Sequence, residues 1–113
     1  MASSSRMGWL EFVYLAPYER MARATIPEYV ERAFEALIIA DPNVGDVVRG
    51  WGGARKVRVA VPGRGKRGGA RSLYFVRLAR GRVNVLTAYT KNVRADLTAT
   101  QRKRVRQIVS TLR

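Results

Sequence analysis

The sequence contains no cysteine and no histidine. Without cysteine the chain can form no disulfide bond, thiolate nucleophile or thiolate metal site, and this absence fits a reducing cytoplasm. Without histidine it lacks the commonest general base and the commonest transition-metal ligand of proteins. Acid–base chemistry by this chain would therefore depend on lysine, arginine, tyrosine or carboxylate side chains.

Long apolar runs are also missing, so the sequence predicts no membrane span. The segment from Met1 to Arg6 lacks the apolar core of a signal peptide. We expect residues 1–8 to be a flexible lead-in and residues 9–113 to form a single domain. With 113 residues, 47% of them hydrophobic, the chain can bury a core.

Acidic residues are almost absent from the second part of the chain. Residues 1–46 contain 4 basic and 7 acidic residues, whereas residues 47–113 contain 18 basic residues and one acidic residue, Asp96. The whole chain has a formal charge of +14. This asymmetry favours a polyanion or an acidic protein as partner, with nucleic acid as the leading candidate. A membrane surface is less favoured, because the basic C-terminal segment has no aromatic anchor.

The residue pattern predicts an α+β domain in the order β-α-α-β-β-β-α, with helices packed on a small antiparallel sheet. Strands are expected, from runs of β-branched and aromatic residues, at 9–15, 56–61, 72–78 and 83–90. Helices are expected at 18–24, 25–40 and from residue 98 to the C-terminus. The last three strands should form an antiparallel meander, and the first strand should join one edge.

Helix starts and buried stripes can also be predicted. Thr25 and Glu28 fit a capping box for the second helix, and Thr98 and Gln101 fit one for the third. The second helix should bury Val30, Ala33, Phe34, Leu37 and Ile38, and expose Glu28, Glu31, Arg32 and Glu35. The third helix should bury Val105, Ile108, Val109 and Leu112. Trp51 is expected to be a packing anchor inside a loop.

A basic, glycine-rich segment, residues 64–71, precedes the strand predicted at 72–78. It contains four cationic side chains: Arg64, Lys66, Arg67 and Arg71. Glycines allow the backbone to approach a ligand closely, and the following strand could hold Arg71 in a fixed position. The segment suits a pocket for a phosphodiester, and it equally suits a plain hairpin loop with solvated charges.

Five short blocks stand out between residues 41 and 98. They are Asp41-Pro42 with Gly45-Asp46, Gly52 to Arg58, Gly65 to Arg71 with Tyr74, Ala88-Tyr89 with Lys91-Asn92, and Asp96 to Thr98. In this order and spacing they resemble the RelE/HigB-like toxins of type II toxin–antitoxin modules. The resemblance implies a RelE-like fold and a ribosome-dependent mRNA endoribonuclease that inhibits translation. It also implies a cognate antitoxin that neutralises the toxin.

Cleavage of RNA by its own 2′-hydroxyl requires a base, stabilisation of the phosphorane charge and an acid for the 5′-oxygen. With no metal or other cofactor expected, the candidate catalytic residues are Arg71, Lys66, Arg67, Tyr89 and Lys91. The arginines would hold the phosphate through paired hydrogen bonds. A lysine would serve as acid or base if neighbouring cations lower its pKa. Tyr89 would activate the hydroxyl or stack on a base, whereas Tyr74 is more typical of a core position.

The remaining basic residues are expected to contact the RNA backbone. They are Arg55, Lys56, Arg58, Arg64, Arg102, Lys103 and Arg106. The cluster at 102–106 would alternatively receive an acidic segment of the antitoxin. The expected partners are therefore the antitoxin, the ribosome and mRNA, in the cytoplasm. Two other hypotheses remain open: a non-catalytic basic RNA- or ribosome-binding module, and a family member that only binds other proteins.

Overall fold

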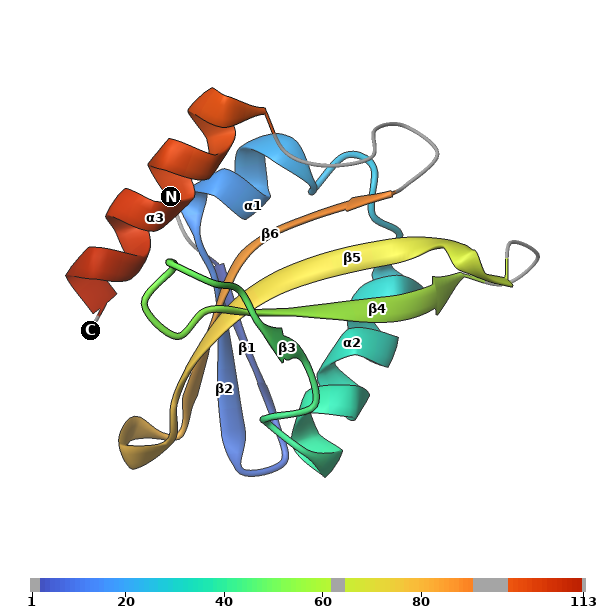
Figure 1. Ribbon diagram of the computed structural model, residues 1–113. Helices are drawn as coiled ribbons and strands as arrows, with labels where there is room; N and C mark the ends of the chain where they lie inside the picture. Colours follow the sequence, from blue (N-terminus) through green and yellow to red (C-terminus); the bar gives the residue numbers. More distant parts are fainter. Residues whose placement is uncertain (1–2, 62–64, 91–97, 113) are drawn as a thin grey trace.

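The computed structural model describes residues 3–61, 65–90 and 98–112 (Figure 1). The elements follow in the order β1 (Ser3–Met7), β2 (Leu10–Tyr14), α1 (Ala16–Met21), α2 (Glu28–Ala40), β3 (Asp46–Val47), β4 (Arg55–Val61), β5 (Gly65–Arg77), the 3₁₀ turn η1 (Leu78–Arg80), β6 (Arg82–Thr90) and α3 (Ala99–Leu112). The strands form one sheet in the order β1-β2-β6-β5-β4-β3. The α+β fold class is confirmed. None of the helices in the described ranges is long and apolar enough to cross a membrane.

The sheet is mixed, so the prediction of an antiparallel sheet is correct only in part. β4, β5 and β6 form the expected antiparallel meander. β2 pairs with β6 in the parallel direction, since the long connection between the two strands permits it. β2 is not an edge strand, because β1 pairs with its other side.

Residues 3–7, which were expected to belong to a flexible lead-in over residues 1–8, form the strand β1. Serine is not among the β-branched and aromatic residues that favour strands, so the local residue pattern does not predict β1. Polar contacts with the two N-terminal helices hold this strand in place. The Ser3 hydroxyl donates to Glu19 at 2.7 Å, and the Ser5 hydroxyl donates to Glu35 at 3.0 Å.

Glu35 is buried, which corrects its predicted place on the outer face of α2. Its carboxylate accepts hydrogen bonds from the Tyr14 hydroxyl and, at 3.2 Å, from the Arg32 guanidinium. Burial, and next the bond to Glu35, raise the pKa of Tyr14 far above its usual value, so this phenol stays a donor. The buried face of α2 is therefore rotated: Ala33 and Leu37, predicted to be buried, are exposed.

Several predicted boundaries were also wrong. α2 begins at Glu28, and Pro27 is its N-cap residue, with no side-chain hydrogen bond to the helix. The Thr25 hydroxyl donates to the Ala22 carbonyl instead of capping the helix. β5 begins at Gly65, so most of the basic segment predicted as a loop is strand. The second capping box is confirmed, because Thr98 and Gln101 exchange hydrogen bonds of 2.9 and 3.2 Å.

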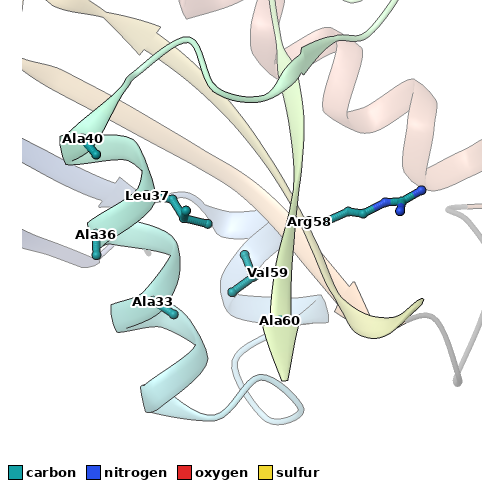
Figure 2. Close-up of a pocket in the computed structure, with 7 residues that line it drawn as sticks. All are labelled: Ala33, Ala36, Leu37, Ala40, Arg58, Val59 and Ala60. Carbon is teal, nitrogen blue, oxygen red and sulfur yellow. The ribbon is translucent and has the colours of Figure 1, made fainter. Parts of the chain in front are cut away.

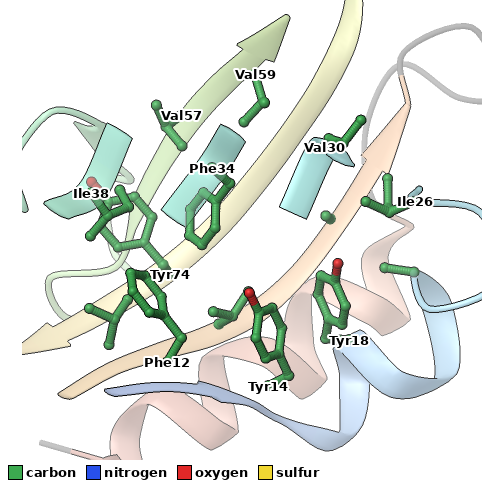
Figure 3. Packing of buried hydrophobic residues seen from close by; sticks show 14 of the residues in the cluster. Phe12, Tyr14, Tyr18, Ile26, Val30, Phe34, Ile38, Val57, Val59 and Tyr74 are labelled. Atoms are coloured by element: carbon green, nitrogen blue, oxygen red, sulfur yellow. The ribbon is translucent and has the colours of Figure 1, made fainter. Parts of the chain in front are cut away.

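Two cores cover the two faces of the sheet. On the α2 face, the rings of Phe12, Phe34 and Tyr74 meet edge to face, with centroids 6.0 and 5.7 Å apart (Figure 3). On the other face, α3 buries Val105 and Val109, with Ile108 and Leu112 partly buried beside them, as predicted. They pack in one cluster with Trp51, Ala54, Leu73, Leu86 and Tyr89. Trp51 is therefore confirmed as a packing anchor.

We expect Glu35→Ala to lower the free energy of unfolding by about 1–3 kcal/mol, because it leaves the buried Tyr14 hydroxyl without an acceptor. Glu28→Ala is the matched control on the same helix: its side chain is 80% exposed, so its effect should stay within about 0.5 kcal/mol. Urea denaturation measures both. Equal effects of the two substitutions would contradict the structural role of Glu35.

Candidate functional site

Three predicted functional residues lie side by side in the sheet. Arg58 of β4 is opposite Arg71 of β5, and Arg71 is opposite Tyr89 of β6. Residues opposite one another on neighbouring strands point to the same face, about 5 Å apart. Arg71 and Leu73 are two residues apart in β5, so their side chains point to the same face of the sheet. Leu73 packs under α3. The row of Arg58, Arg71 and Tyr89, called here the cationic row, therefore lies on the α3 face. Figure 2 shows Arg58 extending from β4 on the side opposite α2.

Arg71 is the unusual member of the cationic row, because its guanidinium is buried. The residue is only 7% exposed, and among the described residues its Nη1 atom has no hydrogen-bond partner. A buried charged donor without an acceptor costs free energy, which a bound anion would recover. The Nη1 atom of Arg71 is thus a donor that an anionic ligand could pair with.

A cleft of about 380 Å³ opens beside Arg71. Its lining residues come from the segment before β4, from β4 itself and from β5: Val44, Gly45, Asp46, Lys56, Val57, Arg58 and Arg71. Lys56 and Arg58 are exposed, as their alternation with the buried Val57 and Val59 predicts. Three cationic side chains therefore border one cleft, which suits a phosphate group.

One wall of the cleft is held by Tyr74. Its hydroxyl donates to the Pro42 carbonyl at 3.0 Å and accepts from the Gly45 amide at 2.9 Å. Gly45 is required there, since a Cβ atom would lie 2.9 Å from both the Lys56 carbonyl and the Tyr74 hydroxyl. Burial raises the pKa of Tyr74, which keeps the phenol protonated. Tyr74 is thus a structural residue on the α2 face.

A comparison with known protein families identifies the family of this chain. The family model described as "RelE toxin of RelE / RelB toxin-antitoxin system" matches residues 11–113. The chain belongs to the RelE toxin family. The match covers α1 through α3, including the whole cationic row, and begins after β1. In this RelE-family toxin, β1 therefore lies outside the matched region.

The structure brings together only some of the predicted site residues. Arg58, Arg71 and Tyr89 share a row, and Lys56 lines the same cleft. Lys66 and Arg67 belong to β5, but their side chains lie outside the described part. Arg64 and Lys91 lie outside the described residues altogether. For these four residues the catalytic or binding roles stay predictions.

Arg55 is separated from the cationic row. Its Nη1 donates to the Gly45 carbonyl at 2.7 Å and to the Asn43 carbonyl at 3.2 Å. Because Arg55 is one residue out of phase with Lys56 in β4, it points to the α2 face. Arg55 therefore holds the cleft wall in place from the α2 face, through the Asn43 and Gly45 carbonyls. An RNA contact by Arg55 stays a prediction.

The basic cluster of α3 lies on the outer side of that helix. Arg102, Lys103 and Arg106 are exposed, whereas Val105 and Val109 face the sheet. Val105 packs in the same cluster as Tyr89, so the helix is fixed on the face that carries the cationic row. The cluster is therefore exposed to solvent, and its role in RNA or antitoxin binding stays a prediction.

Asp46 is a cleft residue that the sequence reasoning missed. It is the one carboxylate among the described cleft-lining residues, and it is paired in register with Lys56 through β3 and β4. No strand is predicted between residues 40 and 56, and Asp46 stands in a sequence block but not among the candidate site residues. Two residues of strand pairing are too short to show a period, but the adjacent Gly45 was an available signal of close packing.

We expect Tyr74→Phe to lower the free energy of unfolding by about 1–3 kcal/mol, since it leaves the Gly45 amide and Pro42 carbonyl without their shared partner. Tyr29→Phe is the control, because Tyr29 is 52% exposed. Thermal unfolding and hydrogen exchange check the prediction, and exchange should rise at Gly45. Unchanged exchange at Gly45 would contradict the account of the cleft wall.

Proposed function

We propose that this RelE-family toxin is a ribosome-dependent endoribonuclease that cuts mRNA, inhibits translation and is neutralised by a cognate antitoxin. The observation that carries the proposal is the buried Arg71 guanidinium, with an unpaired Nη1 beside the cleft, in register with Arg58 and Tyr89. Most buried polar side-chain atoms of proteins have a hydrogen-bond partner, and a phosphate bound in the cleft would supply one for Arg71. Family membership supplies the toxin class, and the site supplies the chemistry.

In the proposed reaction the 2′-oxygen of the RNA attacks the adjacent phosphorus, and the bond from phosphorus to the 5′-oxygen breaks. The products are a 2′,3′-cyclic phosphate and a free 5′-hydroxyl. Arg71 binds the non-bridging phosphate oxygens and stabilises the charge that grows on them, and Arg58 adds a second cation beside it. The requirement for a 2′-hydroxyl excludes DNA as a substrate of this reaction.

Proton transfer in the reaction needs a base at the 2′-hydroxyl and an acid at the 5′-oxygen. Tyr89 is adjacent to Arg71 in the cationic row, which places a phenol next to the proposed phosphate site. Lys66, Arg67 and Lys91 remain candidates for the other proton transfers and phosphate contacts. The reaction as proposed uses these side chains alone, without a metal ion.

The proposed dependence on the ribosome follows from the shape of the site. The cleft is small, and two of its three cations, Lys56 and Arg58, are exposed and so are not fixed by packing. Such a site holds a free RNA strand poorly, and its rate rises when another body orients the strand. The exposed basic residues of α3 would bind the ribosomal RNA backbone, and the proposed place of action is the cytoplasm.

We expect Arg71→Ala to reduce the rate of mRNA cleavage on programmed ribosomes by at least about 100-fold, because it removes the main donor to the phosphorane. Arg71→Lys should recover only part of the rate, since a lysine retains the charge but not the paired geometry. Arg20→Ala, an exposed change on α1, is the control and should cleave normally. Single-turnover kinetics at saturating ribosomes measure the rate.

Ribosome binding by Arg71→Ala, measured by co-sedimentation, should stay close to that of the unsubstituted chain. Cleavage at the normal rate by the folded variant would contradict the proposed function. In that case the non-catalytic binding module would be the better account.

Binding to ribosomes should weaken steeply with salt, because each neutralised phosphate releases a counterion. We expect Arg102→Ala, on the outer face of α3, to lower the slope of log K against log salt by about one. Arg20→Ala should leave the slope unchanged. A flat salt response for the unsubstituted chain would argue against the basic face as the docking surface.

A further inference from the structure

An apolar groove, called here the edge groove, lies between α2 and β4 (Figure 2). It has a volume of about 750 Å³ and is lined by Ala33, Ala36, Leu37, Ala40, Arg58, Val59 and Ala60, with the Arg58 side chain extending away from α2. Leu37 is 38% exposed, and the three helical alanines are exposed. The groove is therefore an uncovered apolar surface on a highly charged chain, which is typical of an interaction site.

The edge groove adjoins an open strand edge. β3 pairs only with Arg55 and Lys56 of β4. Among the described residues, no strand pairs with residues 57–61 on the side away from β5. An edge strand with unpaired amides and carbonyls is a template for an additional strand. An extended peptide can bind there through main-chain hydrogen bonds, with alternate side chains entering a pocket.

We propose that an extended acidic segment of the antitoxin binds along residues 57–61 of β4 as an additional strand. Its alternate residues are small and apolar, facing the edge groove, and acidic, facing Arg58. This inference rests on the proposed function, because it describes how a partner would block the proposed site.

The alternation follows from the geometry of β4. Val57 and Val59 face α2 and the first core, whereas Arg58 faces the cationic row. A residue opposite Arg58 on the added strand would extend that row by one position, about 5 Å from Arg58. A carboxylate there would compete with RNA phosphate for Arg58 at the rim of the cleft. Its neighbours along the strand would bury apolar side chains in the edge groove.

Charge decides between an acidic partner and a second copy of this chain. Residues 47–113 carry 18 basic residues against one acidic residue. Edge-to-edge pairing of two copies would bring the Lys56 and Arg58 side chains of both β4 strands close together, and like charges opposite one another destabilise a sheet. An acidic strand is attracted to the same surface.

The test uses a synthetic ten-residue peptide that alternates valine and glutamate, labelled with fluorescein. Anisotropy should show saturable binding, and hydrogen exchange should show protection of the amides in residues 57–61. A valine–lysine peptide, and a peptide with five valines followed by five glutamates, should bind at least tenfold more weakly. Equal binding of either control peptide, or no binding of the alternating peptide, overturns the proposal.

Two pairs of variants locate the binding surface. Ala36→Trp fills the edge groove and should weaken binding at least tenfold, whereas Glu28→Trp, exposed at the start of the same helix, should not. Arg58→Ala should weaken binding more than Arg49→Ala, an exposed arginine outside the cleft lining. Circular dichroism verifies that all four variants fold. Normal binding by folded Ala36→Trp overturns the proposal.

Analytical sedimentation of the chain alone tests whether a second copy of the chain occupies the edge groove. A dimer that Ala36→Trp dissociates would make the edge groove a contact between copies and would overturn the proposal, whereas a monomer supports it. Peptide binding is measured without ribosomes or RNA, so the outcome is separable from that of the nuclease test. Loss of cleavage in Arg71→Ala with normal peptide binding by Ala36→Trp would leave the proposed function standing and remove only this docking site.

Discussion

The candidate site of this protein is organised around one buried guanidinium, whose burial costs free energy. Arg71 lies in the central strand pair of the sheet, 7% exposed, with an Nη1 atom that no described residue satisfies. Burial takes the charge out of water, which costs free energy that a hydrogen-bonding partner at Nη1 would offset. The fold tolerates this cost because β4 and β6 pair with β5 on both sides and hold the strand rigid.

The surroundings of Arg71 are built to keep a space open beside it. Tyr74 and Gly45 fix the chain before β3 against the sheet, so this segment forms a wall and does not fill the cleft. On the face of the sheet that carries Arg71, α3 is anchored through Val105 in a cluster with Tyr89. The apolar cluster under α3 thus borders the cationic row, and the candidate site lies at the edge of that cluster.

Much of this arrangement follows from sequence patterns that have a strong period. The alternation in Lys56–Val61 and the helical stripe through Val105 and Val109 predict both their elements and their exposed residues. Arg71 and Tyr89 are predicted as site residues from sequence blocks, but their pairing in register depends on hairpin geometry that a sequence does not specify. One wall of the cleft includes β3, which has only two residues. A strand this short shows no alternation of polar and apolar residues, so the sequence does not predict it.

Other features were missed because tertiary contacts override local propensity. The serines of β1 form a strand that pairs with β2, and Glu19 and Glu35 accept hydrogen bonds from the Ser3 and Ser5 hydroxyls. Glu35 is buried in α2 for the same reason, since Tyr14 and Arg32 supply its hydrogen bonds. Thr25 resembles a helix cap in sequence, yet its hydroxyl bonds to Ala22, and Pro27 takes the N-cap position.

The central claim is that translating ribosomes present mRNA to this site for cleavage. The most direct measurement is cell-free translation with the purified chain, followed by primer extension to map new 5′ ends on the mRNA. A parallel reaction contains the same mRNA and chain without ribosomes. The account predicts new ends only where ribosomes translate. Intact mRNA in both reactions, or equal cutting without ribosomes, would contradict it.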